Sequence, residues 1–257
     1  MLEGVGDEVP CGRLLDEVIH RLERQRNNPI FISTTPVDAL RRRAEELEAL
    51  DPEERAALPL YAVPFAVKDN IDVAGVPTTA GCPEYAYVPT QNAFVVDRLL
   101  AAGAILVGKC NLDQFATGLT GMRSVYGSPV NPYSPDHVSG GSSSGSAVAV
   151  SCGIVQFSLG TDTAGSGRIP AGFNNLVDLH NGDARALGEA GMKMHAATAK
   201  LNVAIRVRTK TSHQRIVDRQ RLFKHVLFAA KFAQLFALRQ RRAHRHPQPA
   251  RAQSPPL

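Results

Sequence analysis

Long apolar runs and clustered cysteines are both missing from this chain of 257 residues. No apolar run approaches the roughly 18 residues that a membrane-spanning helix needs. The N-terminal residues also lack the basic and apolar segments of a secretory signal. The cysteines form no CxxC pair and no cluster with histidines (Cys11, Cys82, Cys110 and Cys152). We therefore expect a cytoplasmic protein with reduced thiols, without a membrane segment and without a bound metal.

Two widespread catalytic motifs are absent as well. No Gly-Lys-Ser/Thr follows the glycine-rich stretch at 139–147, which excludes a phosphate-binding P-loop. The chain has no GxSxG, and residues 1–177 contain only His20 and His137. A hydrolase built on a Ser-His-Asp triad therefore finds little support.

Acidic and basic residues divide the chain into two unequal parts. Residues 178–257 hold 16 Lys and Arg against 4 Asp and Glu, a balance of +12. Residues 1–177 hold 13 against 20, a balance of −7. So sharp a change predicts two units, with a boundary near residue 177.

Helical and strand patterns alternate through the first unit. Apolar residues at helical spacing and strong helix formers predict helices, and short apolar runs predict buried strands. The expected helices cover 12–26, 37–50, 92–102 and 111–119, and the expected strands cover 63–68 and 104–108. This alternation indicates an α/β fold with a largely buried sheet.

Two stretches rich in glycine and serine follow, SGGSSSGSA at 139–147 and GTDTAGSGRIPA at 160–171. Glycine lets backbone N–H groups approach a ligand closely, because no Cβ is in the way. Taken singly, these features have simple alternatives. The first stretch is typical of a flexible linker, the second suits a turn, and Lys68 after its strand suits a solvated side chain.

In combination, these stretches and PFAVKDNIDV around Lys68 are similar to the amidase-signature family of serine hydrolases. In that family a lysine, a cis-configured serine and a nucleophilic serine replace Ser-His-Asp. The resemblance implies that Lys68 is the base, Ser142 the bridging serine and Ser166 the nucleophile. It also implies a mixed, buried sheet flanked by helices, here truncated.

The chemistry explains why these residue types suit the task. A serine hydroxyl is a poor nucleophile and needs a base within hydrogen-bond reach. Lysine serves only when neutral, so its pKa near 10.4 must fall through burial or positive neighbours. The resemblance further implies supporting roles for Asp162 and Arg168, for which the alternative is an ion pair that steadies the loop. It implies no metal or organic cofactor, and an oxyanion hole made by backbone N–H groups of Thr163, Ala164, Gly165 and Ser166.

The stretch NLDQFATGL, with Gln114 and Thr117, resembles allophanate hydrolases. The A subunits of glutamyl-tRNA amidotransferases, the alternative, usually read N-M-D-E-F-A-M-G-S there. The resemblance implies hydrolysis of allophanate, a small amide formed by urea carboxylation, with release of ammonia and possible homodimers. It places Gly121, Met122 and Arg123 in a loop near the substrate, although Arg123 equally suits a residue that braces a turn.

The resemblance ends at Val177, where NNLVDLHNGDARALGEAG replaces the family's NN-x-V and Gly-Leu-Lys-Pro-Thr. A shifted reading frame explains this better than a fusion does. We expect an open sheet edge, an uncovered apolar face and an inactive chain. Residues 178–257 are expected to be partly helical, over 220–242, or disordered. The alternative from another functional class is that this basic segment binds nucleic acid. A shifted reading frame that happens to be rich in Lys and Arg would have the same composition.

Overall fold

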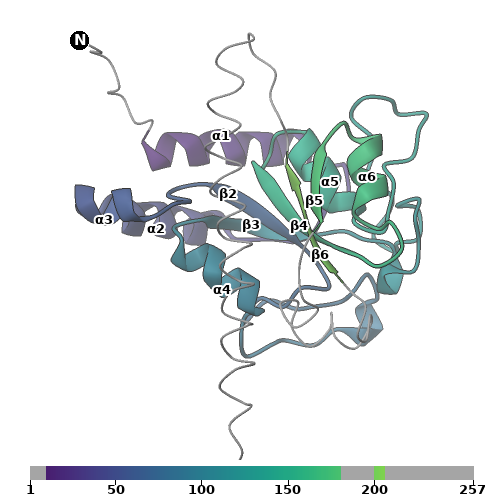
Figure 1. Cartoon of the computed structure of the whole chain (residues 1–257), viewed down its shortest axis with the longest axis horizontal. Coiled ribbons are helices and arrows are strands. Elements are labelled where there is room, and N and C mark those ends of the chain that lie inside the picture. The colour runs from purple at the N-terminus through teal and green to yellow at the C-terminus, as the bar shows by residue number, and fades with distance from the viewer. Residues whose placement is uncertain (1–9, 181–199, 206–257) are drawn as a thin grey trace, which may run out of the picture.

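The computed structural model describes residues 10–180 and 200–205, which form one mixed sheet flanked by helices (Figure 1). The helices are α1 (Cys11–Arg24), α2 (Val37–Glu48), α3 (Pro52–Ala57), α4 (Phe94–Ala101), α5 (Ser144–Ser151) and α6 (Arg168–Phe173). The strands are β1 (Phe31–Thr34), β2 (Pro64–Lys68), β3 (Ile105–Cys110), β4 (Phe157–Asp162), β5 (Val177–His180) and β6 (Lys200–Ile205). Two 3₁₀ turns, η1 (Pro83–Tyr85) and η2 (Gln114–Ala116), complete the described elements.

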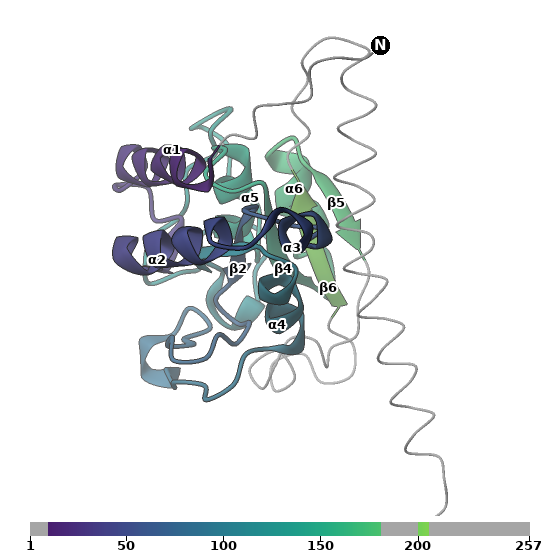
Figure 2. The same cartoon turned by 90° about the vertical axis from the view of Figure 1, so that its left-hand side faces the viewer.

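The sheet has the strand order β1-β3-β2-β4-β6-β5. The central strand β2 runs parallel to β3 and β4, whereas β1, β6 and β5 are added antiparallel at the two sides. Figure 2 shows α1 and α2 side by side, with β5 at the opposite side of the sheet. The expected fold class, a mixed sheet flanked by helices, is therefore confirmed.

Two apolar clusters cover the two faces of the sheet. One joins α1, α2 and α5 to the sheet, and the other joins α4 to it. Strand β2 supplies both, because alternate residues of a strand point to opposite faces. Its Ala66 faces the first cluster, and its Phe65 and Val67 face the second. By the same alternation Lys68 lies on the face of Ala66, which α5 covers.

Most elements expected from the sequence are present, but the helix expected over 111–119 is wrong. Only the turn η2 forms there, and Phe115 and Ala116 have positive φ angles of 51° and 56°. The carboxylate of Asp113 accepts backbone N–H groups of a later turn, at Gly121 and Arg123. These tertiary bonds outweigh the modest helix propensity of the segment.

Beyond Val177 the described backbone continues the sheet. Strand β6 pairs antiparallel with β4, and β5 pairs antiparallel with β6. Strand β4 is therefore paired on both sides, although residues 200–205 lie in a part of the sequence without clear periodicity. The helix expected over 220–242 lies outside the described residues.

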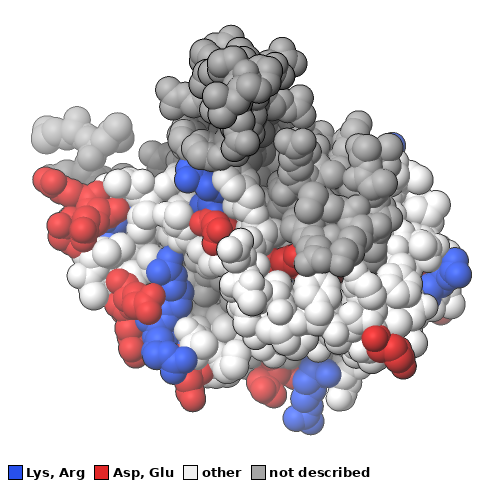
Figure 3. Space-filling model, turned by 90° about the horizontal axis from the view of Figure 1, so that it is seen from below, with Lys and Arg blue, Asp and Glu red and all other residues white. Residues whose placement is uncertain are grey.

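Charged side chains are mixed on the surface of the described residues. On the face seen in Figure 3, acidic and basic side chains lie beside one another, and much of the surface carries neither. No helix in the described part of the chain is long and apolar enough to cross a membrane.

Candidate active site

Lys68, the last residue of β2, is completely buried. Its Nζ lies 2.7 Å from Ser142 Oγ, although 74 residues separate the two along the chain. The same Nζ lies 2.8 Å from Thr161 Oγ1 and 3.4 Å from the Thr161 carbonyl oxygen. The structure thus brings together the first two residues of the expected triad and adds Thr161 to them.

The environment of Lys68 favours its neutral form. Burial lowers its pKa from the ordinary value of a lysine to about 7, and the carboxylates of Asp113 and Asp162 oppose this fall. Around pH 7 the amine is therefore neutral in a large fraction of molecules. A pKa near the working pH is what a general base requires.

Ser142 lies in a buried bend immediately before α5. The Gly141–Ser142 peptide bond is cis, the configuration that the family resemblance implied. The segment fits tightly, because a Cβ at Gly141 would lie 2.1 Å from Asp113 Oδ2. Gly140, with φ +75°, similarly approaches the backbone of Pro170. The two residues before Ser142 are therefore packed closely, one against the Asp113 carboxylate and the other against the Pro170 backbone.

Ser166 lies in the turn between β4 and α6 and is 5% exposed. Its carbonyl oxygen accepts the Ser143 N–H at 3.1 Å. The Ser143 hydroxyl donates in turn to the Thr161 carbonyl at 3.2 Å. These bonds hold the turn with Ser166 against the segment with Ser142, so the backbone of the third expected triad residue lies beside the segment that holds the second.

Asp162 holds this turn together. Its carboxylate accepts the backbone N–H groups of Gly165, Gly167 and Arg168 at 2.7–3.1 Å. It also forms an ion pair with the Arg168 guanidinium at 2.9 Å. Burial acts to raise the pKa of Asp162, but the hydrogen bonds from Arg168 and from the backbone outweigh it and hold that pKa well below its usual range. In the structure the pair steadies the loop.

The four residues expected to form an oxyanion hole differ in their environment. Thr163 and Ala164 are exposed, whereas Gly165 and Ser166 are buried. Gly165 has φ +124°, and a Cβ there would lie 2.8 Å from Ile169 Cδ1. Its N–H donates to Asp162 at 2.7 Å, which directs that donor into the turn.

The loop with Gly121, Met122 and Arg123 lies against the Ser142 segment. The Gly141 N–H donates to the Leu119 carbonyl at 2.9 Å, and Gly121 is buried beside Gly140. Met122 is 61% exposed. Arg123 is also exposed, and its guanidinium donates to the Thr117 carbonyl at 3.0 Å. In the structure Arg123 therefore braces the loop, while its place beside the site keeps the substrate interpretation open.

A buried ion pair beside the site was not expected from the sequence. Lys109 Nζ, in β3, lies 3.1 Å from Asp69 Oδ1, and both side chains are at most 1% exposed. Asp69 also accepts the N–H and the hydroxyl of Thr79, and Lys109 donates to the Thr78 hydroxyl. The available signal was that Lys68 and Lys109 are the last and next-to-last residues of two buried parallel strands, whose carboxyl ends meet at one edge of the sheet.

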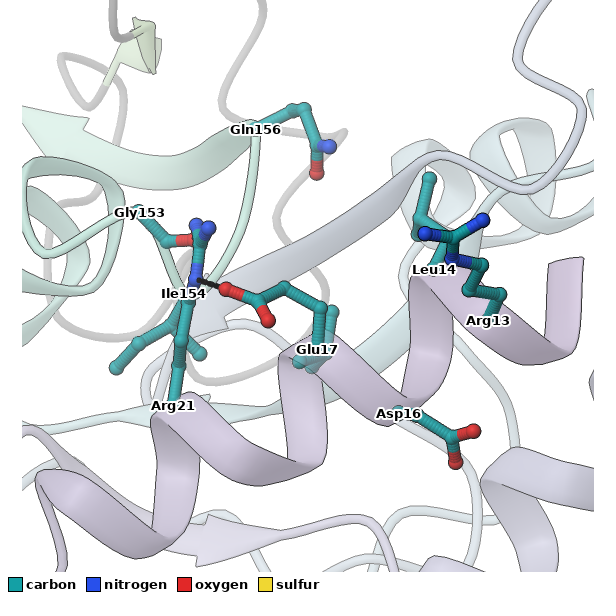
Figure 4. A pocket seen from close by; sticks show the side chains of 9 residues that line it. Arg13, Leu14, Asp16, Glu17, Arg21, Gly153, Ile154 and Gln156 are labelled. Carbon is teal, nitrogen blue, oxygen red and sulfur yellow. Dashed lines mark hydrogen bonds and ion pairs between the residues drawn. The ribbon is translucent and has the colours of Figure 1, made fainter. Parts of the chain in front are cut away.

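A hollow of about 580 Å³ lies elsewhere, between α1 and the turn after α5 (Figure 4). Arg21 crosses it, bonded to Glu17 at 2.6 Å and to the Gly153 carbonyl. Its lining includes no residue of the expected triad. In the described part of the chain, no group of three or more His, Cys, Asp or Glu residues could hold a metal ion.

Comparison with known proteins identifies the architecture around this site. The family model for amidases matches residues 13–180. The chain belongs to the amidase family. Over 127 residues it is 63% identical to the urea amidolyase of Saccharomyces cerevisiae, covering 49% of this chain and 7% of that protein. Over 138 residues it is 48% identical to the A subunit of the glutamyl-tRNA(Gln) amidotransferase of Acidobacterium capsulatum, covering 53% and 29%.

A solved structure gives the same result. The allophanate hydrolase of Kluyveromyces lactis superposes with a TM-score of 0.63 and 42% identity, covering 76% of this chain and 32% of that one. The expected resemblance of the N-terminal part to allophanate hydrolase is confirmed. The chain spans less than a third of each of these relatives.

Proposed function

We propose that this amidase region hydrolyses an amide-type C–N bond with Ser166 as nucleophile, Ser142 as proton relay and Lys68 as base. The observation that carries the proposal is the buried contact of 2.7 Å between Lys68 Nζ and Ser142 Oγ, with the Ser166 turn bonded to the next residue. Burial of Lys68 supplies the neutral amine that such a base needs.

Thr161 directs the lone pair of that amine. A neutral lysine has two N–H donors and one lone pair. The Thr161 hydroxyl and carbonyl oxygens lie 2.8 and 3.4 Å from Nζ and accept the two N–H groups. The lone pair is then left for the Ser142 hydroxyl, which makes Lys68 a proton acceptor for the relay.

The proposed reaction has two halves. Ser166 Oγ bonds to the substrate carbonyl carbon while its proton passes to Ser142, whose own proton passes to Lys68. The C–N bond then breaks as Ser142 returns a proton to the leaving nitrogen and is reprotonated by Lys68. Water cleaves the acyl-enzyme by the same relay. Because Gly165 donates to Asp162, we assign the oxyanion hole to the N–H groups of Thr163, Ala164 and Ser166.

Allophanate is the substrate that we propose, with ammonia as the leaving group. Two observations support it: the NLDQFATGL stretch, and relatives named urea amidolyase and allophanate hydrolase. The exposed guanidinium of Arg123 suits a substrate that carries a carboxylate. Relatives named as parts of a glutamyl-tRNA(Gln) amidotransferase keep glutamine as the second candidate.

A substrate panel tests the proposal on the purified 257-residue chain. Ammonia release from allophanate, with little from glutamine and none from either substrate with the Ser166→Ala variant, would support the proposal and would contradict the expected inactivity of the truncated chain. Ser134→Ala is the control, because the hydrogen bonds that this half-buried serine forms with described residues lie within its own loop. Release from glutamine alone would favour the amidotransferase alternative, and release that survives Ser166→Ala would refute the assigned nucleophile.

The division into an amidase region and a basic unit over 178–257 stays a prediction, although β5 and β6 join the sheet of the amidase region. Translation of the nucleotide sequence around codon 177 in the other frames tests the proposed frameshift. A shifted frame that reads Gly-Leu-Lys-Pro-Thr would support it, and stop codons in both alternatives would refute it.

A further inference from the structure

The buried carboxylate of Asp113 lies among the glycines of two separate segments. Asp113 follows β3, is completely buried and precedes η2. A Cβ at Gly118 would lie 2.4 Å from its Oδ2, and a Cβ at Gly141 would lie 2.1 Å from the same atom. The backbone on both sides is thus shaped around one side chain, and Gly141 is the residue before Ser142.

Hydrogen bonds tie both segments to this residue. Its Oδ2 accepts the Gly121 N–H at 3.0 Å, and its Oδ1 accepts the Arg123 N–H at 2.7 Å. Its own N–H donates to the Ser142 carbonyl at 3.1 Å, and the Gln114 N–H donates to the Arg123 carbonyl at 2.6 Å. One residue therefore joins the candidate relay serine to the candidate substrate loop.

We propose that Asp113 is a positioning residue that holds Ser142 and the turn from Gly121 to Arg123 as one unit. A displacement of that turn, such as a bound substrate would cause, then reaches Ser142 through Asp113. Its carboxylate is bonded to the Gly121 and Arg123 N–H groups, and its own N–H is bonded to the Ser142 carbonyl. The catalytic consequence rests on the proposed function. The mechanical link rests only on the contacts of Asp113.

The charge of Asp113 gives this link an electrostatic signature. Two carboxylates act on Lys68, those of Asp113 and Asp162, and both raise its pKa against the larger effect of burial. Asp162 is neutralised by Arg168, whereas Asp113 has no ion-pair partner among the described residues. Loss of the Asp113 charge therefore lowers the pKa of Lys68, while disorder that admits water would raise it.

Nuclear magnetic resonance tests the proposal without requiring turnover. The full chain contains seven lysines, so the signal of carbon-13-labelled Lys68 is identified as the one missing from Lys68→Met. In Asp113→Asn we expect the Lys68 titration midpoint to fall by about one pH unit. We also expect the amide signals of Ser142, Gly121 and Arg123 to shift together. An unchanged midpoint, or a Ser142 amide that does not move, would overturn the proposal.

Two further variants distinguish the position of the Asp113 carboxylate from its charge, and both from a general effect on folding. Gly118→Ala keeps the charge but displaces the carboxylate, so the Ser142 and Gly121 amides should shift as they do in Asp113→Asn. Asp72→Asn, another buried carboxylate, should leave the Lys68 midpoint and the Ser142 amide unchanged. If the chain releases no ammonia, the proposed function fails while these signals still decide the role of Asp113.

Discussion

At Lys68, burial and neighbouring charge together decide whether the side chain acts as a base. Burial alone would favour the neutral amine strongly, and the carboxylates of Asp113 and Asp162 moderate this effect, leaving a pKa of about 7. A lower value would weaken the base, and a higher one would leave it protonated at neutral pH. The residue contributes to catalysis through this balance as much as through its contact with Ser142.

This balance predicts the pH dependence of hydrolysis. Lys68 is charged and unable to accept a proton below its pKa, so kcat/KM should rise with pH and level off above about 7. Steady-state ammonia release between about pH 5 and 9 measures the profile. A flat profile through this range would contradict a lysine base.

The ion pair between Lys109 and Asp69 predicts a large effect on stability. Lys109→Met leaves the Asp69 carboxylate buried without its cation, which should lower the free energy of unfolding by about 3–5 kcal/mol. Urea unfolding measures the change. Arg41→Ala breaks the exposed pair with Asp16 and is the control, with an expected cost of about 0–1 kcal/mol. Equal effects of the two variants would contradict the importance of burial.

Among the elements, α5 matters most for the site because it begins beside Ser142 and packs on β4, β2 and β3. Its close approach depends on Gly145, where a Cβ would lie 2.2 Å from the Ile30 carbonyl oxygen and 2.6 Å from the Asn111 nitrogen. Both are backbone atoms that cannot move independently. Helix α5 can therefore lie this close to the backbone beside β1 and β3 only because residue 145 has no Cβ.

Gly145→Ala should consequently separate α5 from the sheet. We expect a loss of about 1–3 kcal/mol in the free energy of unfolding, as for other overpacked sites, together with a fall in hydrolysis. Gly172→Ala is the matched control, because apart from its chain neighbours and the backbone of its own helix no atom lies within 4 Å of a Cβ placed there. Thermal melts of both variants give the comparison, and a Gly145→Ala chain as stable as the wild type would contradict this packing.

The elements also show how far the sequence alone could lead. Strands β2 and β3 were predictable because a buried parallel strand is a continuous apolar run. Strand β6 and the irregular turn at 111–119 were not, because distant residues decide them. The expected triad followed from motif order. Thr161 and Asp113 lie within the quoted stretches but were not singled out there, and Lys109 lies in none of them. Their importance arises from contacts with residues far away along the chain, Lys68 for Thr161, Ser142 for Asp113 and Asp69 for Lys109.

At the scale of the whole molecule, the described residues form one continuous sheet with the candidate site at the carboxyl ends of β2 and β4. The chain spans less than a third of the relatives compared. Even so, the contacts among Lys68, Ser142, Thr161 and the Ser166 turn lie wholly within residues 10–180. The central claim is that these contacts activate Ser166.

Reaction with a fluorophosphonate, which phosphonylates activated serines, tests that claim most directly and requires no knowledge of the substrate. Intact mass and peptide mapping of the treated chain should show one phosphonyl group, on Ser166. Labelling should vanish in Ser166→Ala, slow strongly in Lys68→Met and persist in Ser134→Ala. Absence of labelling in the wild type, or equal rates with and without Lys68, would contradict the claim.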